Sequence, residues 1–297
     1  MITAFFLACT PSESDTASES PAEAPLSEPL RFVVIADPHV TSVDGDARVR
    51  LDRAVDWINA ESDPRNLRVA LVVGDIAWGD GLAPARESLD QLGIPWVPIN
   101  GDNEIQAGFE EAYHLAFATH YEELATTLDA WVMGPVEVAN PEFGVPSWFN
   151  NVAFSIGDVR FVGLDWASRQ IHPFLGEFGA LHDFEGGTWP FFEEQLVAAA
   201  EGPDENVVMF SHIPMHGGPF SLEQMDRITG VTAPLADHVW ADLAGHYHAD
   251  GSGTVEGTGY ELHVTDATWD DDVEVRLVEM GGTTQRFEPV TETVVVP

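Results

Sequence analysis

The sequence predicts an α/β fold built around a parallel sheet, and two observations support this prediction. Apolar runs rich in β-branched residues, at 31–36 and 68–73, are typical of buried strands. A segment with helical spacing of its apolar residues, at 47–60, separates the two runs. A strand, a helix and a second strand of these lengths form a βαβ unit, whose two strands run parallel.

Each strand of this unit ends at side chains that can bind a metal ion. Asp37 and His39 follow the first strand, and Gly74-Asp75 follows the second. Side chains two residues apart in an extended chain point the same way, so Asp37 and His39 can reach one ion. Parallel strands bring their carboxyl ends to one edge of the sheet, where open α/β sheets bind ligands. We therefore expect Asp75 to lie beside Asp37 and His39.

Further predicted strands, at 96–99, 207–210 and 239–244, also end at polar side chains. These strand ends carry, in order, Gly101-Asp102-Asn103-Glu104, Ser211-His212 and Gly245-His246-Tyr247-His248. Taken singly, such residues are more typical of ordinary turns. Their recurrence after one strand after another favours a shared site.

The remaining segments complete the predicted fold. They are helices at 84–92, 108–130 and 190–200, a loop at 134–151, a hairpin of strands 152–156 and 159–164, an irregular segment at 166–188, and strands within 253–296. We expect the last strands to complete a second sheet. His114 and His120 lie among Tyr, Phe and Leu, so we interpret both as packing or surface residues.

The charge balance limits the partners of this protein. The 297 residues include 50 acidic and 12 basic side chains, all twelve of them Arg, which gives a net charge of -38. Such a field repels nucleic acid polymers and anionic lipid surfaces, so we expect neither as a partner. It fits life in moderate or high salt, although acidic surfaces also simply aid solubility.

Residues 1–29 differ in composition from the rest of the chain. An apolar run at 2–8 ends at Cys9, the single cysteine, and residues 10–29 are rich in Ser, Pro, Ala and Glu. This pattern resembles a bacterial lipoprotein signal followed by a disordered linker, with Cys9 as the lipidated residue. The run is short and no Arg precedes it. A start site assigned too far downstream would explain both features. An ordinary export signal and a cytosolic location are the alternatives.

We therefore predict a signal and linker at 1–29 and one folded domain at 30–297. The protein is expected in the bacterial envelope, periplasmic or on the surface, with membrane contact only through a lipid at Cys9. No other segment has the ~20 consecutive apolar residues that a membrane span needs.

The polar strand ends resemble the motifs of the calcineurin-like metallophosphoesterase superfamily. That pattern is DxH, GDxx, GNH[D/E], H and GHxH. It is matched in order by Asp37-x-His39, Gly74-Asp75, Gly101-Asp102-Asn103-Glu104, His212 and Gly245-His246-x-His248. The resemblance covers residues 31–248, and five motifs in one order make it specific.

The resemblance implies a four-layered α/β/β/α sandwich of two mixed sheets flanked by helices, with a binuclear metal centre. By motif, one metal is held by Asp37, His39, Asp75 and His248, and the other by Asp75, Asp102, His212 and His246. Oxygen and imidazole ligands without thiolate suit divalent or trivalent Mn, Fe or Zn. Two such ions ~3.5–4 Å apart bind phosphate and lower the pKa of a bridging water. The implied reaction is attack of that hydroxide on a small-molecule or nucleotide phosphomonoester or phosphodiester.

Two residues depart from the superfamily pattern at the third motif. Asp102 replaces a neutral Asn ligand with a charged one, which should hold the metal at least as well. Asn103 replaces the His that is credited with protonating the leaving group. Asn donates a hydrogen bond but has no proton to give near neutral pH. In this GDNE variant Asp75 and Asn103 remain catalytic candidates. The proton is expected from the substrate or from another residue, with His216 and His172 as the first candidates.

Other positions carry narrower expectations. Trp78 stands where purple acid phosphatases have an iron-binding Tyr, so we expect no purple colour. Arg169 could contact phosphate, although a surface role is the simpler interpretation. Aromatic residues within 148–189 line an entrance or, more simply, pack under the helices.

Two rival functions follow from the same residues. The first is a non-catalytic, metal-stabilised surface binding protein of the same fold, which the loss of the catalytic His favours. The second is an α/β domain whose Asp and His residues stand at turns by coincidence, and this requires five coincidences in order.

Overall fold

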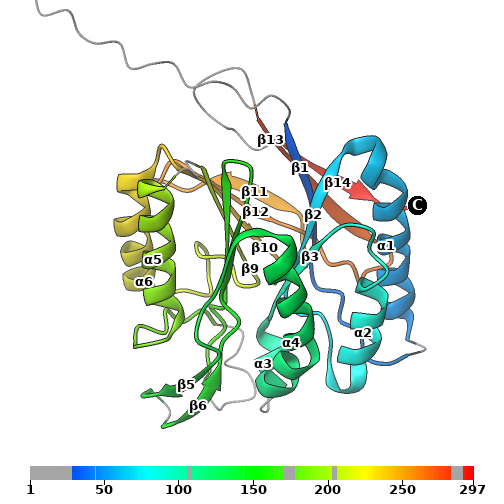
Figure 1. Cartoon of the computed structure of the whole chain (residues 1–297), viewed down its shortest axis with the longest axis horizontal. Helices are drawn as coiled ribbons and strands as arrows, with labels where there is room; N and C mark the ends of the chain where they lie inside the picture. The colour runs from blue at the N-terminus through cyan, green and yellow to red at the C-terminus, as the bar shows by residue number, and fades with distance from the viewer. Residues whose placement is uncertain are drawn as a thin grey trace, which may run out of the picture.

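The structure is a computed structural model that describes residues 29–43, 45–105, 109–142, 144–169, 178–202, 206–281 and 290–297. Cys9 and His172 lie outside the described residues. The chain forms two large sheets, packed face to face, with helices on the outer face of each (Figure 1). The predicted four-layered α/β/β/α sandwich is confirmed.

The first sheet has five strands in the order β14-β13-β1-β2-β3. Their bounds are β1 Leu30–Ile35, β2 Leu67–Val73, β3 Trp96–Ile99, β13 Glu274–Met280 and β14 Val290–Val295. Strands β1, β2 and β3 are parallel, as the βαβ pattern predicts, and β13 pairs antiparallel with β1. The sheet is therefore mixed.

The second sheet has seven strands in the order β11-β12-β10-β9-β8-β7-β4. Their bounds are β4 Asp129–Met133, β7 Val152–Ile156, β8 Val159–Leu164, β9 Asn206–Ser211, β10 Val239–Ala244, β11 Gly251–Thr254 and β12 Glu261–Val264. Strands β8, β9, β10 and β12 are parallel, and β4, β7 and β11 pair antiparallel at the two sides.

The helices cover the outer faces and connect the strands. Their bounds are α1 Asp46–Arg65, α2 Leu82–Leu89, α3 Asp102–Ile105, α4 Phe109–Thr127, α5 Thr188–Glu201 and α6 Leu222–Thr232, with short 3-10 turns η1 Gly79–Gly81 and η3 Ala233–Leu235. Helix α1 packs on β2, and α5 packs on β8 and β9. In Figure 1, α1 and α2 lie on one side of the sandwich and α5 and α6 on the other.

The structure corrects two of the predicted segments. The strands after residue 250 do not complete one sheet, because β11 and β12 extend the second sheet while β13 and β14 extend the first. Residues 134–151 are not only loop, because β5 Glu137–Asn140 and β6 Val145–Trp148 pair as a two-stranded hairpin. Only four residues contribute to each of these two strands, which leaves little periodicity to detect.

Two hydrophobic clusters hold the layers together. The larger lies between the sheets, where it includes Phe32, Phe161 and Phe210, and continues to the helices of the first sheet, where it includes Leu51 of α1 and Phe117 of α4. The smaller lies between the second sheet and its helices and includes Phe192 of α5 and Ile228 of α6. Because the sheets pack face to face, the carboxyl ends of β1, β2, β3, β9 and β10 open onto one edge of the sandwich.

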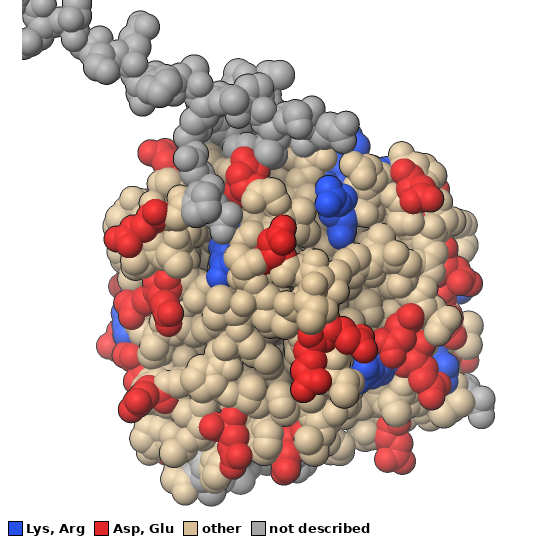
Figure 2. Space-filling view, viewed as in Figure 1, with Lys and Arg blue, Asp and Glu red and all other residues tan. Residues whose placement is uncertain are grey.

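No helix in the described part of the chain is long and apolar enough to cross a membrane. Acidic side chains are spread over the face seen in Figure 2, with few Arg between them, in keeping with the net charge of -38.

Candidate metal centre

The strand ends at this edge share an unusual backbone conformation. Five residues there have left-handed φ angles although none is glycine: Asp37 at 49°, His39 at 48°, Asp75 at 48°, His246 at 74° and His248 at 48°. Each such residue costs about 1–3 kcal/mol, and such residues cluster at functional sites. The fold thus bends the chain out of each strand so that these side chains point into one space.

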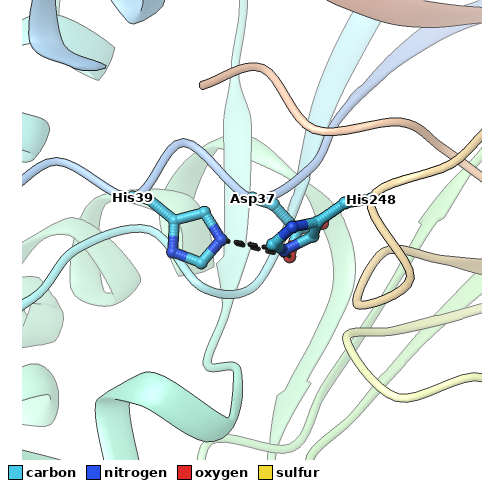
Figure 3. A group of neighbouring side chains, drawn as sticks. All are labelled: Asp37, His39 and His248. Carbon is cyan, nitrogen blue, oxygen red and sulfur yellow. Dashed lines mark hydrogen bonds and ion pairs between the residues drawn. The ribbon is translucent and has the colours of Figure 1, made fainter. Parts of the chain in front are cut away.

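Asp37, His39 and His248 form the first group of possible ligands (Figure 3). The Nε2 atoms of His39 and His248 lie 3.0 Å apart. Asp37 Oδ1 lies 3.3 Å from His248 Nε2 and 3.7 Å from His39 Nε2. Ligands that each lie ~2 Å from one ion are separated by about these distances. The three atoms therefore converge as a metal site requires.

Asp102, His212 and His246 form the second group. Asp102 Oδ1 lies 2.9 Å from His212 Nε2 and 3.2 Å from His246 Nδ1. The two imidazole nitrogens lie 3.3 Å apart. This group is more deeply placed than the first, because Asp102 and His212 are both buried.

Asp75 lies between the two groups and faces both. Its Oδ1 is 3.4 Å from His212 Nε2, in the second group, and its Oδ2 is 3.9 Å from His39 Nε2, in the first. One carboxylate thus offers one oxygen to each side. The seven side chains that the motifs single out, Asp37, His39, Asp75, Asp102, His212, His246 and His248, are all brought together.

Two glycines allow the strand ends to approach this closely. A Cβ atom on Gly101 would lie 2.1 Å from Asp75 Oδ1, and one on Gly74 would lie 2.5 Å from His212 Cβ. Gly74 also has a φ of +79°, which disfavours other residues. Any side chain at either position would displace Asp75 or His212.

Glu104 holds two of the strand ends in register. Its Oε2 accepts hydrogen bonds from the backbone N–H groups of Gly101 (2.6 Å) and Asp75 (3.0 Å), and its Oε1 accepts one from Ala77 (2.8 Å). Burial raises its pKa to about 7. Glu104 was not predicted as a site residue, although it is the last residue of the Gly101-Asp102-Asn103-Glu104 run. Carboxylates behind the ligands of a metal commonly orient them.

The backbone of the first sheet orients His212. Its Nδ1–H donates to the carbonyl of Val73 at 3.0 Å, which leaves Nε2 directed at Asp75 and Asp102. Burial lowers the pKa of His212, but the charge of Asp75 and the hydrogen bond to Asp102 outweigh it and hold this pKa well above the ordinary value. A metal ion on Nε2 takes the place of that proton.

Burial, neighbouring charges and hydrogen bonds also shift the pKa values of the other ligand groups. Burial lowers the pKa of His39 to about 4, so this imidazole is neutral at neutral pH. Burial raises the pKa of Asp102, but hydrogen bonds from His212 and His246 hold it well below its usual range. Burial also raises the pKa of Asp75 well above its usual range, and a nearby cation reverses that effect.

Asn103 and Trp78 flank His39. The backbone N–H of Asn103 donates to Asp75 Oδ1 at 2.9 Å, and its Nδ2 lies 2.5 Å from Asp75 Oδ2 and 3.0 Å from His39 Nδ1. The indole Nε1–H of Trp78 donates to His39 Nδ1 at 2.8 Å. The Asn103 amide therefore lies against the carboxylate that faces both groups.

Other candidates from sequence lie elsewhere. The ring of His216 is held by Thr229 Oγ1 at 3.2 Å and by the Tyr260 hydroxyl at 2.9 Å, and His216 is not among the residues that line the cavity at the centre. His120 is buried and stacks on Trp96 with ring centroids 3.8 Å apart, as a packing residue should.

Arg169 is neither a surface residue nor a phosphate contact. It is buried, and its guanidinium pairs with Asp165 and, at 2.9 Å, with Glu110. Its Cζ atom also lies 4.4 Å from the centre of the Phe149 ring. Both expectations for Arg169 were therefore wrong, because one of its partners, Glu110 on α4, is distant in sequence and only the fold brings the two together.

The centre opens into a cavity of about 470 Å³. Its walls include Asp75, Asp102, Asn103, Gly218, Pro219 and Tyr247. Two of the three candidate carboxylates and three of the four candidate imidazoles line it, and the other two groups, Asp37 and His212, are buried beside them. This donor set, without thiolate, suits borderline and hard transition-metal ions, so the residues present fit the metals that the motifs imply.

Comparison with known proteins identifies the relatives of this chain. A family model described as calcineurin-like phosphoesterase matches residues 30–257. Comparison with curated proteins by sequence finds no match.

Solved structures share the fold at low identity. Purple acid phosphatase PPD1 from yellow lupin (Lupinus luteus) is 13% identical, with a TM-score of 0.51, over 91% of this chain and 55% of that one. The 5'-nucleotidase of Candida albicans is 14% identical, with a TM-score of 0.51, over 91% and 52%. GAP50, the anchor in the inner membrane complex of Plasmodium, is 11% identical, with a TM-score of 0.52, over 90% and 85%. The chain thus spans about half the length of the first two.

Proposed function

The chain belongs to the calcineurin-like phosphoesterase family, and on that premise we propose that it hydrolyses a phosphomonoester or phosphodiester with two metal ions. One observation carries the proposal. Two groups of convergent ligands flank Asp75, and each oxygen of its carboxylate faces a different group. A single ion would leave one of these groups, with its buried charges, without a partner.

In this proposal Asp37, His39, Asp75 and His248 hold one ion, and Asp75, Asp102, His212 and His246 hold the other. Mn, Fe and Zn are the candidate metals. When bound, two such ions neutralise phosphoryl oxygens and lower the pKa of a water molecule. The chain itself supplies orientation: the Val73 carbonyl and the Glu104 carboxylate fix His212 and the loop of Asp75.

Asn103 limits the proton chemistry that the chain can provide. Its amide lies beside Asp75 and can donate a hydrogen bond to a phosphoryl or leaving-group oxygen, but it cannot give up a proton. The leaving group must then take its proton from the substrate, from water or from another side chain. Esters with acidic leaving groups are the substrates that suffer least from this lack.

The charge of the protein narrows the substrate class. A net charge of -38 opposes the approach of a nucleic acid polymer. Small phosphoesters, nucleotides included, are the substrates that fit the cavity of about 470 Å³.

Hydrolysis is tested with p-nitrophenyl phosphate and bis-p-nitrophenyl phosphate, in the presence of Mn and again after chelation. Turnover that disappears on chelation and returns with Mn is the expected result. Elemental analysis of the same samples should find two metal equivalents. Two bound equivalents without turnover of any ester in a wider panel would contradict hydrolysis.

The alternative is a metal-stabilised surface protein that binds a partner without catalysis. Asn103, in place of the family's His, is the observation that favours it. Likeness to solved structures does not decide between the two, because enzymes and an anchor protein share this fold. The complete set of seven candidate ligands supports the enzyme, because a protein of this fold that has lost catalysis usually loses metal ligands as well.

Asn103→His tests whether the missing histidine limits turnover. A histidine at this position should raise the turnover of alkyl phosphates, whose leaving groups need a proton, by about 10²-fold. Turnover of p-nitrophenyl esters should change much less, because p-nitrophenolate leaves without help. No gain on alkyl phosphates, with the wild type already fast, would show that the proton comes from another source.

We also propose that residues 30–297 form the catalytic domain and that Cys9 anchors it in the bacterial envelope by a lipid. The support is the sequence of residues 1–29 alone. Detergent partitioning of the wild type and of Cys9→Ser, expressed in a bacterial host, tests this. A wild type that stays in the aqueous phase would contradict the anchor.

A further inference from the structure

Exposed aromatic side chains are gathered at the mouth of the metal centre. In the described part of the chain, four aromatic residues are more than a third exposed: Trp78 at 48%, Phe178 at 47%, Tyr247 at 43% and Trp269 at 38%. The first three line the cavity. The Trp269 ring lies 5.6 Å from the His39 ring and 5.8 Å from the His248 ring. Exposed apolar surface gathered in one place marks a binding site, whereas scattered residues do not.

Contacts with the protein hold these side chains in place. The hydroxyl of Tyr247 accepts a hydrogen bond from the backbone N–H of Gly218 at 3.1 Å. The indole Nε1–H of Trp78 donates to His39. For Phe178 the backbone is held, because the Ser168 N–H donates to its carbonyl and the N–H of the next residue, Gly179, donates to the Pro219 carbonyl. Side chains fixed in advance lose little freedom when a ligand binds, which favours affinity.

No Lys or Arg lines the described part of this cavity, and the whole chain has no Lys. The charged or titratable side chains of the walls are carboxylates and imidazoles, which would serve as ligands of the metal ions. A phosphoryl group at the centre is therefore balanced, but a second phosphate or a carboxylate farther out would meet no cation. The cavity suits a ligand with one phosphoryl group and an uncharged remainder.

Resting on the proposed function, we propose that the substrate is a singly phosphorylated ester that carries an uncharged planar ring. Its phosphoryl group lies at the metal centre, and its ring lies against the faces of Phe178, Tyr247 and Trp78. A phenyl-type ring and a nucleoside base share this chemistry. Stacking of a base on an aromatic side chain strengthens binding by about tenfold or more.

Binding without hydrolysis provides the direct test. Phenylphosphonate and methylphosphonate carry an uncleavable C–P bond and differ only in the ring. Calorimetric titration of the Mn-loaded full chain should find phenylphosphonate bound about tenfold more tightly. Equal affinities would overturn the proposal. A failure of both phosphonates to bind would overturn it as well.

The aromatic residues are tested by Phe178→Leu and by Phe178→Leu combined with Tyr247→Leu. The ratio of the two affinities should fall in the single variant and approach one in the double variant. Methylphosphonate affinity and metal content should stay within about twofold of wild type. Trp57→Leu, on the far helix α1, is the matched control and should keep the wild-type ratio. A ratio unchanged in Phe178→Leu, which alters only an exposed side chain, would overturn the proposal.

Turnover distinguishes the two sources of the ring. Adenosine 5'-monophosphate and ribose 5-phosphate release the same type of alcohol but differ in the base. A higher kcat/KM for the nucleotide assigns a nucleoside ring, and equal values beside a phenylphosphonate preference assign an aryl ring. A preference for phenylphosphonate without turnover of any ester would overturn the proposed hydrolysis and leave the ring site standing.

Discussion

Two clusters of polar side chains lie near strand β10, and they differ in how their charges are balanced. The metal centre lies beyond the carboxyl end of β10. The second, here called the His216 cluster, lies between β10 and α6 and consists of His216, Thr229, Asp242 and Tyr260. Both contain a buried Asp and a His that follows a strand end, so the residue types alone do not distinguish them.

In the metal centre each carboxylate faces several imidazoles or N–H groups, and five of the seven ligand residues have left-handed backbones. In the part of the chain that the structure describes, the imidazole of the His216 cluster meets two hydroxyls, and Asp242 accepts one hydrogen bond, from the N–H of Met215 at 3.0 Å. Its Oδ1 has no partner within the described residues. Convergence of ligand atoms, rather than the presence of Asp and His, separates a metal site from a buried polar cluster.

Asp75→Asn should have the largest effect, because it breaks the link between the two halves of the centre. An amide presents oxygen to one ion and N–H₂ to the other. Loss of one ion would remove several kcal/mol of transition-state charge stabilisation, so kcat/KM for bis-p-nitrophenyl phosphate should fall on the order of 10³-fold. Asp183→Asn, at an exposed position, is the control and should match wild type. Retention of two metal equivalents in Asp75→Asn would argue against the shared ligand.

Glu104→Gln tests whether the carboxylate behind the ligands holds the strand ends together. Both carboxylate oxygens of Glu104 accept hydrogen bonds from backbone N–H groups, whereas glutamine has only one side-chain oxygen. At least one backbone donor would then face an amide N–H₂ group. We expect the free energy of unfolding to fall by about 3 kcal/mol. Urea denaturation at pH 8, above the Glu104 pKa of about 7, measures this. Glu87→Gln, an exposed control, should change stability by less than about 0.5 kcal/mol.

The metal centre was more predictable from sequence than its surroundings were. Each ligand follows a predicted strand that ends in a turn, and parallel pairing of β1 with β2 then places Asp37 and Asp75 side by side. Pairing between distant segments has no such local signal. Strand β13 lies beside β1 although about 240 residues separate them, and Arg169, in the segment after β8, pairs with Glu110 of α4. These contacts depend on which surfaces the tertiary fold brings together.

Asp242 makes the stability of the folded protein depend on pH. Burial raises its pKa to about 7, while in the unfolded chain this group titrates near 3.8. The folded protein therefore keeps a proton that the unfolded chain releases, so stability falls as pH rises from about 4 to 7 and levels off above. Between pH 5 and 7 the wild type should lose about 2 kcal/mol more than Asp242→Asn.

Urea titrations of both proteins at pH 5, 6, 7 and 8 measure this difference. Only the difference between the two curves counts, because other groups contribute equally to both. Parallel curves would mean that Asp242 is ionised in the folded protein and has a partner that balances its charge.

His216→Ala should have the smallest effect on catalysis, and it tests the comparison most directly. Both ring nitrogens of His216 face hydroxyls of Thr229 and Tyr260, away from the metal ligands. We expect kcat/KM to stay within about twofold of wild type, while stability falls by about 1 kcal/mol because the Tyr260 hydroxyl loses its partner.

His216→Gln, which keeps a hydrogen-bonding side chain, should restore most of that stability. A drop in turnover beyond tenfold with unchanged metal content would mean that His216 reaches the substrate after all and supplies the proton that Asn103 cannot. If turnover is unchanged, His172 becomes the remaining histidine candidate from the sequence. His172→Ala, assayed on alkyl and p-nitrophenyl phosphates together, then decides whether any histidine protonates the leaving group: a selective loss on the alkyl ester assigns that role to His172, and an equal response on both leaves the proton to water or the substrate.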